Sequence, residues 1–121
     1  MENKTVLVVE DNEMNMELVR TLLQIGNYRI LEADNAEEGI RIAREEKPDL
    51  ILMDVQLPGM NGLEATKTIK SDDEVGETPV VILTGYGAAI DDMVEEIVYD
   101  GCITKPIETR KFLRTIADYL K

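Results

Sequence analysis

The sequence predicts an α/β fold in which a parallel sheet is doubly wound, with helices on both of its faces. Two observations carry this prediction: continuous apolar runs recur along the chain, and segments with helical periodicity lie between them. Continuous rather than alternating apolarity indicates strands that are buried on both faces, as they are in a parallel sheet. The strand–helix order repeats five times, which implies right-handed crossovers and a five-stranded sheet flanked by five helices.

The predicted strands are short runs rich in β-branched residues or leucine. They are Thr5–Val9, Tyr28–Leu31, Leu50–Met53, Val80–Leu83 and Cys102–Thr104. The predicted helices are segments whose apolar residues recur three or four positions apart. In chain order these residues are Met14, Leu18, Val19, Leu22 and Leu23; Ala36, Ile40 and Ala43; Leu63, Thr66 and Ile69; Ile90, Met93, Val94 and Ile97; and Phe112, Leu113, Ile116, Ala117 and Leu120.

Capping and turn residues agree with these boundaries. Either Asn12 or Asn15 caps the first helix, and either Asp34 or Asn35 caps the second. Pro48 ends the second helix, because a proline disfavours helical backbone at the residue before it. No internal repeat, low-complexity tract or linker interrupts the pattern, so residues 1–121 are predicted to form one domain.

Composition narrows the class of protein. With 121 residues, 44% of them hydrophobic and 31% charged, the chain can bury its own core. Its net charge of −12 would repel nucleic-acid phosphates and anionic lipids, so neither is an expected partner. A single cysteine forms no internal disulfide, and Val6–Val9 is too short for a signal peptide or a membrane span, so a cytoplasmic location is expected.

The chain has no histidine. This absence excludes serine–histidine and cysteine–histidine nucleophile pairs, histidine zinc sites and a phosphohistidine intermediate of the chain itself. Any chemistry must therefore depend on carboxylates, hydroxyl groups and lysine.

Polar residues follow four of the five predicted strands. In an open α/β sheet, ligands bind beyond the carboxyl ends of the strands. Those ends carry Glu10 and Asp11 after the first strand, Asp54 after the third, Thr84 and Gly85 after the fourth, and Lys105 after the fifth. Each residue alone has a simpler explanation as a turn, a cap or a solvated side chain. Their convergence on one rim of the sheet favours a functional site.

Electrostatics then favours a bound cation. Two like charges about 4 Å apart repel by about 4 kcal/mol at an effective dielectric constant near 20. A hard ion such as Mg²⁺ relieves this repulsion with oxygen ligands, and Lys105 supplies a second positive centre. A carboxylate nucleophile beside two cations is suited to phosphoryl transfer, which yields an acyl phosphate.

The sequence resembles the response-regulator receiver family of two-component signalling over essentially its whole length. The strings that carry the resemblance are VLVVEDN (6–12), LILMDVQLPGMNG (50–62), VVILTG (80–85) and GCITKPI (101–107). No single string is decisive, but four in this order at these separations are specific. The resemblance implies a flavodoxin-like fold with sheet order 2-1-3-4-5.

The resemblance also implies a metal site and a phosphoacceptor. Glu10 and Asp11 are similar to the acidic pair that holds Mg²⁺, with Asp11 the more direct ligand and Glu10 acting mainly through water. Asp54 is similar to the phosphoacceptor and is also a metal ligand. The backbone carbonyl of Gln56 would complete the protein's share of the coordination.

Three further positions match the family's phosphate-binding residues. Thr84 resembles the switch hydroxyl that turns inward onto the phosphoryl group. Gly85 stands where the family prefers a small residue that leaves access for the phosphate. Lys105 resembles the phosphate-binding cation, and its bond to Pro106 is usually cis in this family.

One position departs from the family pattern. Receivers commonly carry Tyr or Phe three residues before the lysine, where Cys102 stands here. The sequence favours Cys102 as a buried small thiol that behaves as a hydrophobe. We therefore expect switching to depend mainly on Thr84 and on movement of the loop around Tyr86. That expectation fails if Tyr86 lies in the same place with and without a phosphate mimic.

Three other functions compete with a phosphorylated switch. An FMN electron carrier of this fold needs a phosphate-cradling loop after the first strand, where Glu10 and Asp11 would repel the phosphate. A phosphatase with an aspartyl nucleophile generally has a second acid where Gln56 stands, and a cap domain for which 121 residues leave no room. A receiver-shaped adaptor that is never phosphorylated would not need Asp54, Thr84 and Lys105 together.

The resemblance implies partners rather than enzymatic turnover. The phosphodonor should be a phosphohistidine on a histidine kinase or a histidine phosphotransfer domain. Phosphorylation should change protein contacts through the face formed by the predicted helix at 90–97, the strand at 102–104 and the helix at 112–120. A phosphorylation-dependent dimer is one form such contacts can take. Asp91, Glu95 and Lys111 are expected to be exposed on this face.

The receiver-like pattern extends to Lys121, and no effector domain is expected within these 121 residues. The chain is either a stand-alone regulator or a piece of a hybrid kinase or longer regulator, and Met1 slightly favours the first.

Overall fold

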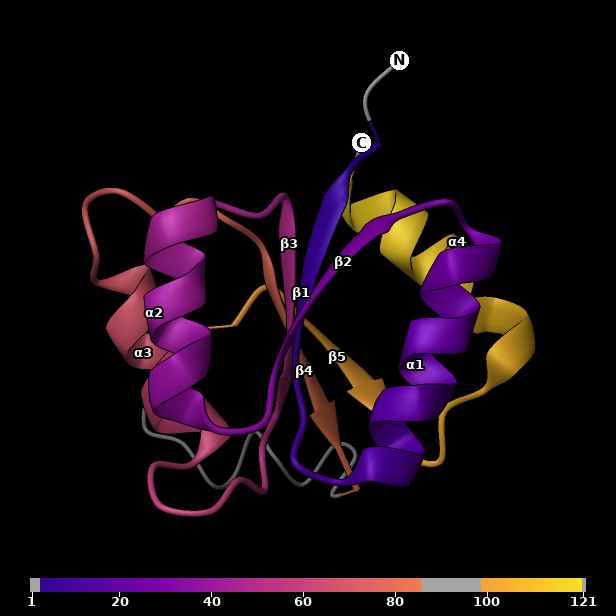
Figure 1. The fold of residues 1–121 in the computed structure, drawn as a ribbon, viewed down its shortest axis with the longest axis horizontal. Coiled ribbons are helices and arrows are strands. Elements are labelled where there is room, and N and C mark those ends of the chain that lie inside the picture. Colours follow the sequence, from indigo (N-terminus) through magenta and orange to yellow (C-terminus); the bar gives the residue numbers. More distant parts are fainter. Residues whose placement is uncertain (1–2, 86–98, 121) are drawn as a thin grey trace.

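The computed structural model describes residues 3–85 and 99–120, which form a sheet between two layers of helices (Figure 1). The strands are β1 (Thr5–Val9), β2 (Arg29–Ala33), β3 (Leu50–Asp54), β4 (Val80–Thr84) and β5 (Gly101–Thr104). The helices of the described part are α1 (Glu13–Ile25), α2 (Ala36–Glu46), α3 (Gly62–Lys70) and α4 (Thr109–Tyr119).

All strand pairs are parallel, and the strand order is β2-β1-β3-β4-β5. The predicted doubly wound parallel sheet and its order are therefore confirmed. Every residue of β3 and β4 is buried, which explains why both strands are apolar up to their last residues, Asp54 and Thr84. The edge strand β2 has the pattern exposed, half-buried, half-buried, exposed, buried, so its sequence carries charge.

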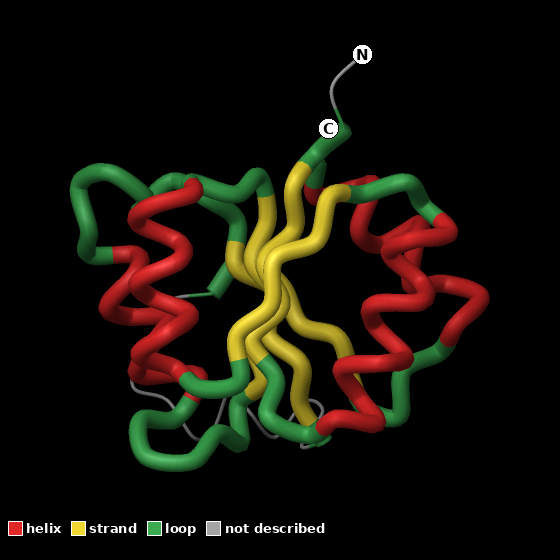
Figure 2. Tube along the Cα trace, viewed as in Figure 1, coloured by secondary structure: helices red, strands yellow, loops and turns green. Residues whose placement is uncertain are grey.

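The helices cover the two faces of the sheet in pairs. Figures 1 and 2 show α2 and α3 on one side and α1 and α4 on the other. Alternate strand residues feed two cores: Leu7 and Ile51 belong to the core beneath α2 and α3, and Val8 and Leu52 to the core beneath α1 and α4. This alternation follows from the two-residue period of a strand.

The predicted helix at 90–97 lies outside the described residues. Of the five predicted helices, the other four are present in the described part, and the last of them is α4. None of these helices combines the length and apolarity needed to cross a membrane.

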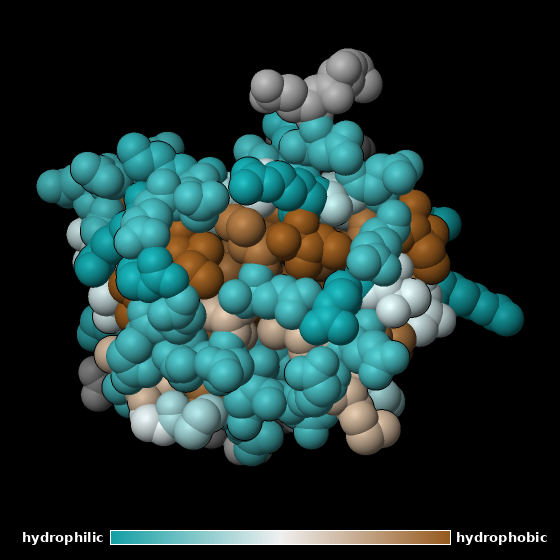
Figure 3. Space-filling view, viewed as in Figure 1, coloured by the Kyte–Doolittle hydropathy of each residue, from teal (hydrophilic) through white to brown (hydrophobic). Residues whose placement is uncertain are grey.

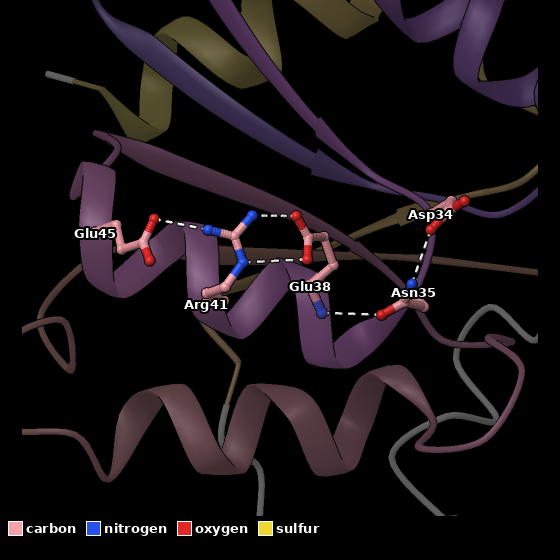
Figure 4. Close-up of polar contacts among 5 residues, drawn as sticks. All are labelled: Asp34, Asn35, Glu38, Arg41 and Glu45. Atoms are coloured by element: carbon pink, nitrogen blue, oxygen red, sulfur yellow. Dashed lines mark hydrogen bonds and ion pairs between the residues drawn. The ribbon is translucent and has the colours of Figure 1, made fainter.

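Asparagine side chains begin three of the helices. Asn12 Oδ1 accepts from the Asn15 N–H at 3.0 Å, which selects Asn12 as the cap of α1. Asn35 Oδ1 accepts from the Glu38 N–H at 2.9 Å, which selects Asn35 rather than Asp34 for α2 (Figure 4). Asn61, which the sequence interpretation did not identify, caps α3. These caps fix the loops that leave β1, β2 and β3.

Charged side chains reinforce the outer surface of α2. The Arg41 guanidinium lies between Glu38, one turn earlier, and Glu45, one turn later, and hydrogen-bonds both (Figure 4). Figure 3 shows hydrophilic side chains over most of this face of the molecule, with hydrophobic ones gathered over the strands between α1 and α2. The ion pairs of Arg41 with Glu38 and Glu45 join residues three and four positions apart, a spacing at which opposite charges stabilise a helix by a few tenths of a kcal/mol per pair.

The predicted bounds hold for β1 and differ at the other four strands. β3 and β4 each extend one residue further than predicted, to Asp54 and Thr84. β2 runs from Arg29 to Ala33 rather than over Tyr28–Leu31, because Arg29 pairs with Thr5 and Ala33 with Val9 across the sheet. The polar residue Glu32 lies within this edge strand and hides its extent from an apolarity criterion. β5 begins one residue earlier than predicted, at Gly101, which pairs with Val81. As predicted, α2 ends just before Pro48.

Candidate phosphoryl-acceptor site

The carboxyl ends of the strands meet at the lower edge of the sheet in Figure 1, where the predicted site residues lie. Glu10 and Asp11 directly follow β1, and Asp54 is the last residue of β3. Thr84 ends β4, and Lys105 follows β5. The parallel register brings residues from four strands to one edge, as the sequence predicted for such a sheet.

Three carboxylates converge at this edge. One ligand oxygen from each of Glu10, Asp11 and Asp54 lies within 4.8 Å of the others. Glu10 and Asp54 are buried, with exposed fractions of 1% and 3%, whereas Asp11 is exposed. Burial of two acidic groups so close together is costly unless cations compensate for their charge.

Lys105 supplies one compensating charge. Its Nζ atom lies 3.0 Å from Asp54 Oδ1 and 3.4 Å from Glu10 Oε1, so it donates to both buried carboxylates. The main chain holds this lysine in place, because its N–H donates to the Thr84 carbonyl at 2.7 Å. The Lys105–Pro106 peptide bond is cis, as the family resemblance implied.

One lysine does not satisfy the cluster. Burial, together with a hydrogen bond to Asp54, raises the pKa of Glu10 from 4.5 to about 7. Glu10 Oε2 is buried and has no hydrogen-bond partner among the described residues. An orphaned buried carboxylate oxygen beside two further carboxylates is a donor set that suits a hard divalent cation. The residues present therefore fit Mg²⁺.

The backbone around Asp54 is held rigidly. The Gln56 N–H donates to Asp54 Oδ1 at 3.2 Å, and the Gly62 N–H donates to the Val55 carbonyl at 2.9 Å. A Cβ atom at Gly62 would lie 1.9 Å from the Asp54 carbonyl oxygen. Only glycine allows α3 to begin this close to Asp54, and the sequence interpretation missed this requirement, because nothing in the local sequence reveals the contact.

Thr84 and Gly85 lie next to the end of β3, which is Asp54. Asp54 pairs with Leu83 in the β3–β4 register, so Thr84 is one residue beyond the pairing partner of Asp54. Thr84 is 1% exposed, whereas Gly85 is exposed. A Cβ atom at Gly85 would have no heavy atom of the described residues within 4 Å, so these residues leave the space around Gly85 open.

Further acidic side chains, which were not predicted, lie on one side of the site. A hollow beside Glu10 and Asp11 is also lined by Glu13, Glu32, Asp34 and Glu38. Arg20 binds Glu32 with two hydrogen bonds, of 2.5 and 2.8 Å, which lower the pKa of the Glu32 carboxyl. The sequence did not predict this hollow, because its lining residues lie far apart in the sequence, in or beside α1, β2 and α2.

The prediction for Cys102 was wrong. The residue is exposed rather than buried, which agrees with the position of β5 at the edge of the sheet. It lies in a pocket with Lys105 and Lys111. Lys111 is exposed, as expected. Tyr86, Asp91 and Glu95 lie outside the described residues.

Comparison with known proteins places the whole chain in one protein family. The sequence profile named "Response regulator receiver domain" matches residues 6–117. The chain is 45% identical over 120 residues to the polar-differentiation response regulator DivK of Brucella anthropi, covering 97% of this chain and 96% of the relative. It is 43% identical over 120 residues to DivK of Brucella ovis, with the same shares covered.

Two solved structures have the same fold as this chain. The chemotaxis response regulator CheY4 of Vibrio cholerae superposes with a TM-score of 0.90 at 26% identity, over 98% of this chain and all of that one. The receiver domain of the sensor histidine kinase PA1611 of Pseudomonas aeruginosa, which has a magnesium ion in its active-site cleft, has a TM-score of 0.90. It is 24% identical over 98% of each chain, so this likeness concerns the fold. The chain belongs to the response regulator receiver domain family of two-component signalling.

Proposed function

We propose that residues 1–121 form a phosphorylation-dependent switch that accepts a phosphoryl group on Asp54. The observation that carries this proposal is the convergence of three carboxylates within 4.8 Å, with the Lys105 ammonium 3.0 Å from Asp54. A buried nucleophile flanked by an ammonium group and a cation site has the arrangement that phosphoryl transfer requires.

The reaction would proceed by in-line displacement. A carboxylate oxygen of Asp54 attacks the phosphorus atom, and the bond from phosphorus to the imidazole nitrogen of a phosphohistidine breaks. The imidazole keeps the bonding electrons and takes up a proton as it leaves, and the product is an aspartyl phosphate. The phosphohistidine belongs to a histidine kinase or a phosphotransfer domain, because this chain has no histidine.

The residues around Asp54 have complementary roles in this proposal. Lys105 neutralises charge on the transferred group, and the Thr84 hydroxyl binds a phosphoryl oxygen. Gly85 leaves access for that group, consistent with the open space around it. The main chain at Gly62 keeps the acceptor loop fixed while the chemistry occurs.

The cation site would be formed by Glu10, Asp11, Asp54 and the backbone carbonyl of Gln56. Mg²⁺ bound there would polarise the phosphoryl oxygens and neutralise their charge. The orphaned Oε2 of Glu10 and the raised pKa of its carboxyl support a cation at this position. Glu10 therefore acts in its ionised form once the cation compensates for its burial.

The phosphorylated chain would signal through altered protein contacts on the β5–α4 face, and a dimer is one such contact. A small phosphodonor such as phosphoramidate tests the acceptor directly, with intact mass as the readout. Wild type should gain one phosphoryl group in Mg²⁺ and none in EDTA, and Asp54→Asn should gain none. The exposed carboxylate variant Glu17→Gln serves as the control and should react like wild type.

The outcomes separate the alternatives. Labelling that persists in Asp54→Asn would contradict the assignment of the acceptor. No labelling of wild type by any phosphodonor would instead favour an adaptor that is never phosphorylated. Sustained turnover of phosphate esters would favour a phosphatase.

A further inference from the structure

Two arginines on α4 have no ion-pair partner in the part of the chain that the structure describes. The chain has six arginines, and four of them, Arg20, Arg29, Arg41 and Arg44, form ion pairs with carboxylates. Arg110 and Arg114 are exposed and form no ion pair or hydrogen bond with the side chains of residues 3–85 and 99–120. Their lack of partners contrasts with the excess of 25 acidic over 13 basic residues in the chain.

These arginines share one face of the helix. Phe112 and Ile116 are buried against the core, so the opposite side of α4 faces outward. Arg110 and Arg114 are four residues apart on this outer side, and the exposed Ala117 continues the same stripe one turn later. Like charges at this spacing repel by a few tenths of a kcal/mol, so the pair does not stabilise the helix itself.

We infer that the outer face of α4, formed by Arg110, Arg114 and Ala117, binds an acidic segment of a partner protein. The two guanidinium groups start about 6 Å apart along the helix axis. That separation matches two carboxylates one turn apart on a helix or two positions apart on a strand. Guanidinium is the cation best suited to bind carboxylates in pairs of hydrogen bonds, and Ala117 allows the partner close approach.

Charge distribution favours this occupant over others. Three of the four ionised side chains on α4 are basic, on a protein of net charge −12. DNA or an anionic membrane would meet the repulsion of the whole chain, and each needs more cations than this face offers. In a symmetric contact through this face, a second copy would place its own Arg110 and Arg114 beside these arginines, and the like charges would repel each other.

This inference rests on the proposed function to the extent that protein contacts carry the signal. A labelled alanine-based peptide with two glutamates four residues apart is the probe, and its binding to the full chain is followed by fluorescence anisotropy. Wild type should bind it at low ionic strength and more weakly at about 0.15 M salt. Arg110→Glu/Arg114→Glu should weaken binding about tenfold or more.

Two further variants make the test specific. Arg110→Lys/Arg114→Lys should lose part of the affinity, because lysine keeps the charge but not the paired hydrogen bonds. Lys4→Glu/Lys67→Glu changes the net charge by the same amount at exposed positions without ion pairs among the described residues, and should stay within about twofold of wild type. Circular dichroism checks folding, and Arg110→Ala/Arg114→Ala replaces the charge-reversal variant if that one unfolds.

Several results would overturn the inference. The first is that Arg110→Glu/Arg114→Glu and Lys4→Glu/Lys67→Glu weaken binding of the peptide equally. The second is that wild type does not bind the peptide at low salt. The third is that duplex DNA or anionic vesicles bind more tightly than the peptide through the same arginines. Self-association that disappears in the arginine variant would assign the face to a second copy instead. Phosphoramidate labelling of the same variants keeps the two proposals apart, because it should be unchanged whether or not the peptide binds.

Discussion

The Nζ atom of Lys105 lies 3.0 Å from Oδ1 of Asp54, although 51 residues separate the two in the chain. The lysine side chain is 22% exposed and the aspartate side chain 4%, so the pair is largely shielded from water. An ion pair in this setting depends on both partners, since loss of one leaves a buried charge without compensation.

Replacement of Lys105 by methionine should therefore lower the free energy of unfolding by about 1–2 kcal/mol without divalent ions, and abolish detectable labelling by phosphoramidate. Urea unfolding at neutral pH in EDTA measures the first effect. Lys111→Met is the matched control, because its 3.7 Å contact with Glu108 is exposed and should contribute less than about 0.5 kcal/mol. Equal stability of the two variants would contradict the structural role of Lys105.

The pH dependence of the free energy of unfolding should show the raised pKa of the Glu10 carboxyl. Its pKa is raised to about 7 in the folded protein from 4.5, so the folded state holds a proton more tightly than the unfolded state. The stability of the metal-free protein should therefore fall as pH rises from about 5 through 7. Thermal unfolding in EDTA measures this fall, and Glu10→Gln, which does not titrate, should be nearly insensitive over that range.

Magnesium should change this profile. Binding requires ionised carboxylates, so the stabilisation by Mg²⁺ should grow as pH rises through 7. Asp11→Asn should reduce the thermal shift at pH 8, whereas Glu17→Gln, an exposed carboxylate on α1, should preserve it. A shift of equal size in all three proteins would mean that the ion binds elsewhere.

Gly62 and Gly85 should differ sharply in their tolerance of a methyl group. Gly62→Ala forces a Cβ atom to within 1.9 Å of the Asp54 carbonyl, so it should cost about 2 kcal/mol or more in urea unfolding. Gly85→Ala enters open space and should stay within about 0.5 kcal/mol of wild type. If the two variants are equally stable, the loop after β3 does not pack as described.

The exposed thiol of Cys102 should react in the folded protein. A disulfide reagent such as dithionitrobenzoate should modify it at a rate within about tenfold of that in urea, because Cys102 is exposed on the edge strand. Much slower modification of the native protein would restore the expectation of a buried side chain. Cys102→Ser gives the background rate for this chain, which has one cysteine.

The sequence by itself determined the fold and predicted which residues lie together at one edge of the sheet. Apolar runs in β1, β3 and β4 report burial on both sheet faces, and a sheet of parallel strands must bring their carboxyl ends to one edge. The proximity of Glu10, Asp54 and Lys105 follows from that topology alone. The predicted helix at 90–97 stays a prediction, since it lies outside the described residues.

The tertiary structure decided what depends on neighbours distant in the sequence. It buries Glu10 and raises its pKa, it demands glycine at position 62 because the Asp54 carbonyl lies there, and it exposes Cys102 on an edge strand. Local patterns predict which residues lie along each strand and helix, because hydrophobicity follows the period of the element. The burial of a side chain, the space available to it and the pKa of its ionisable group depend on atoms from other helices and strands. Only the packed structure brings those atoms close to it.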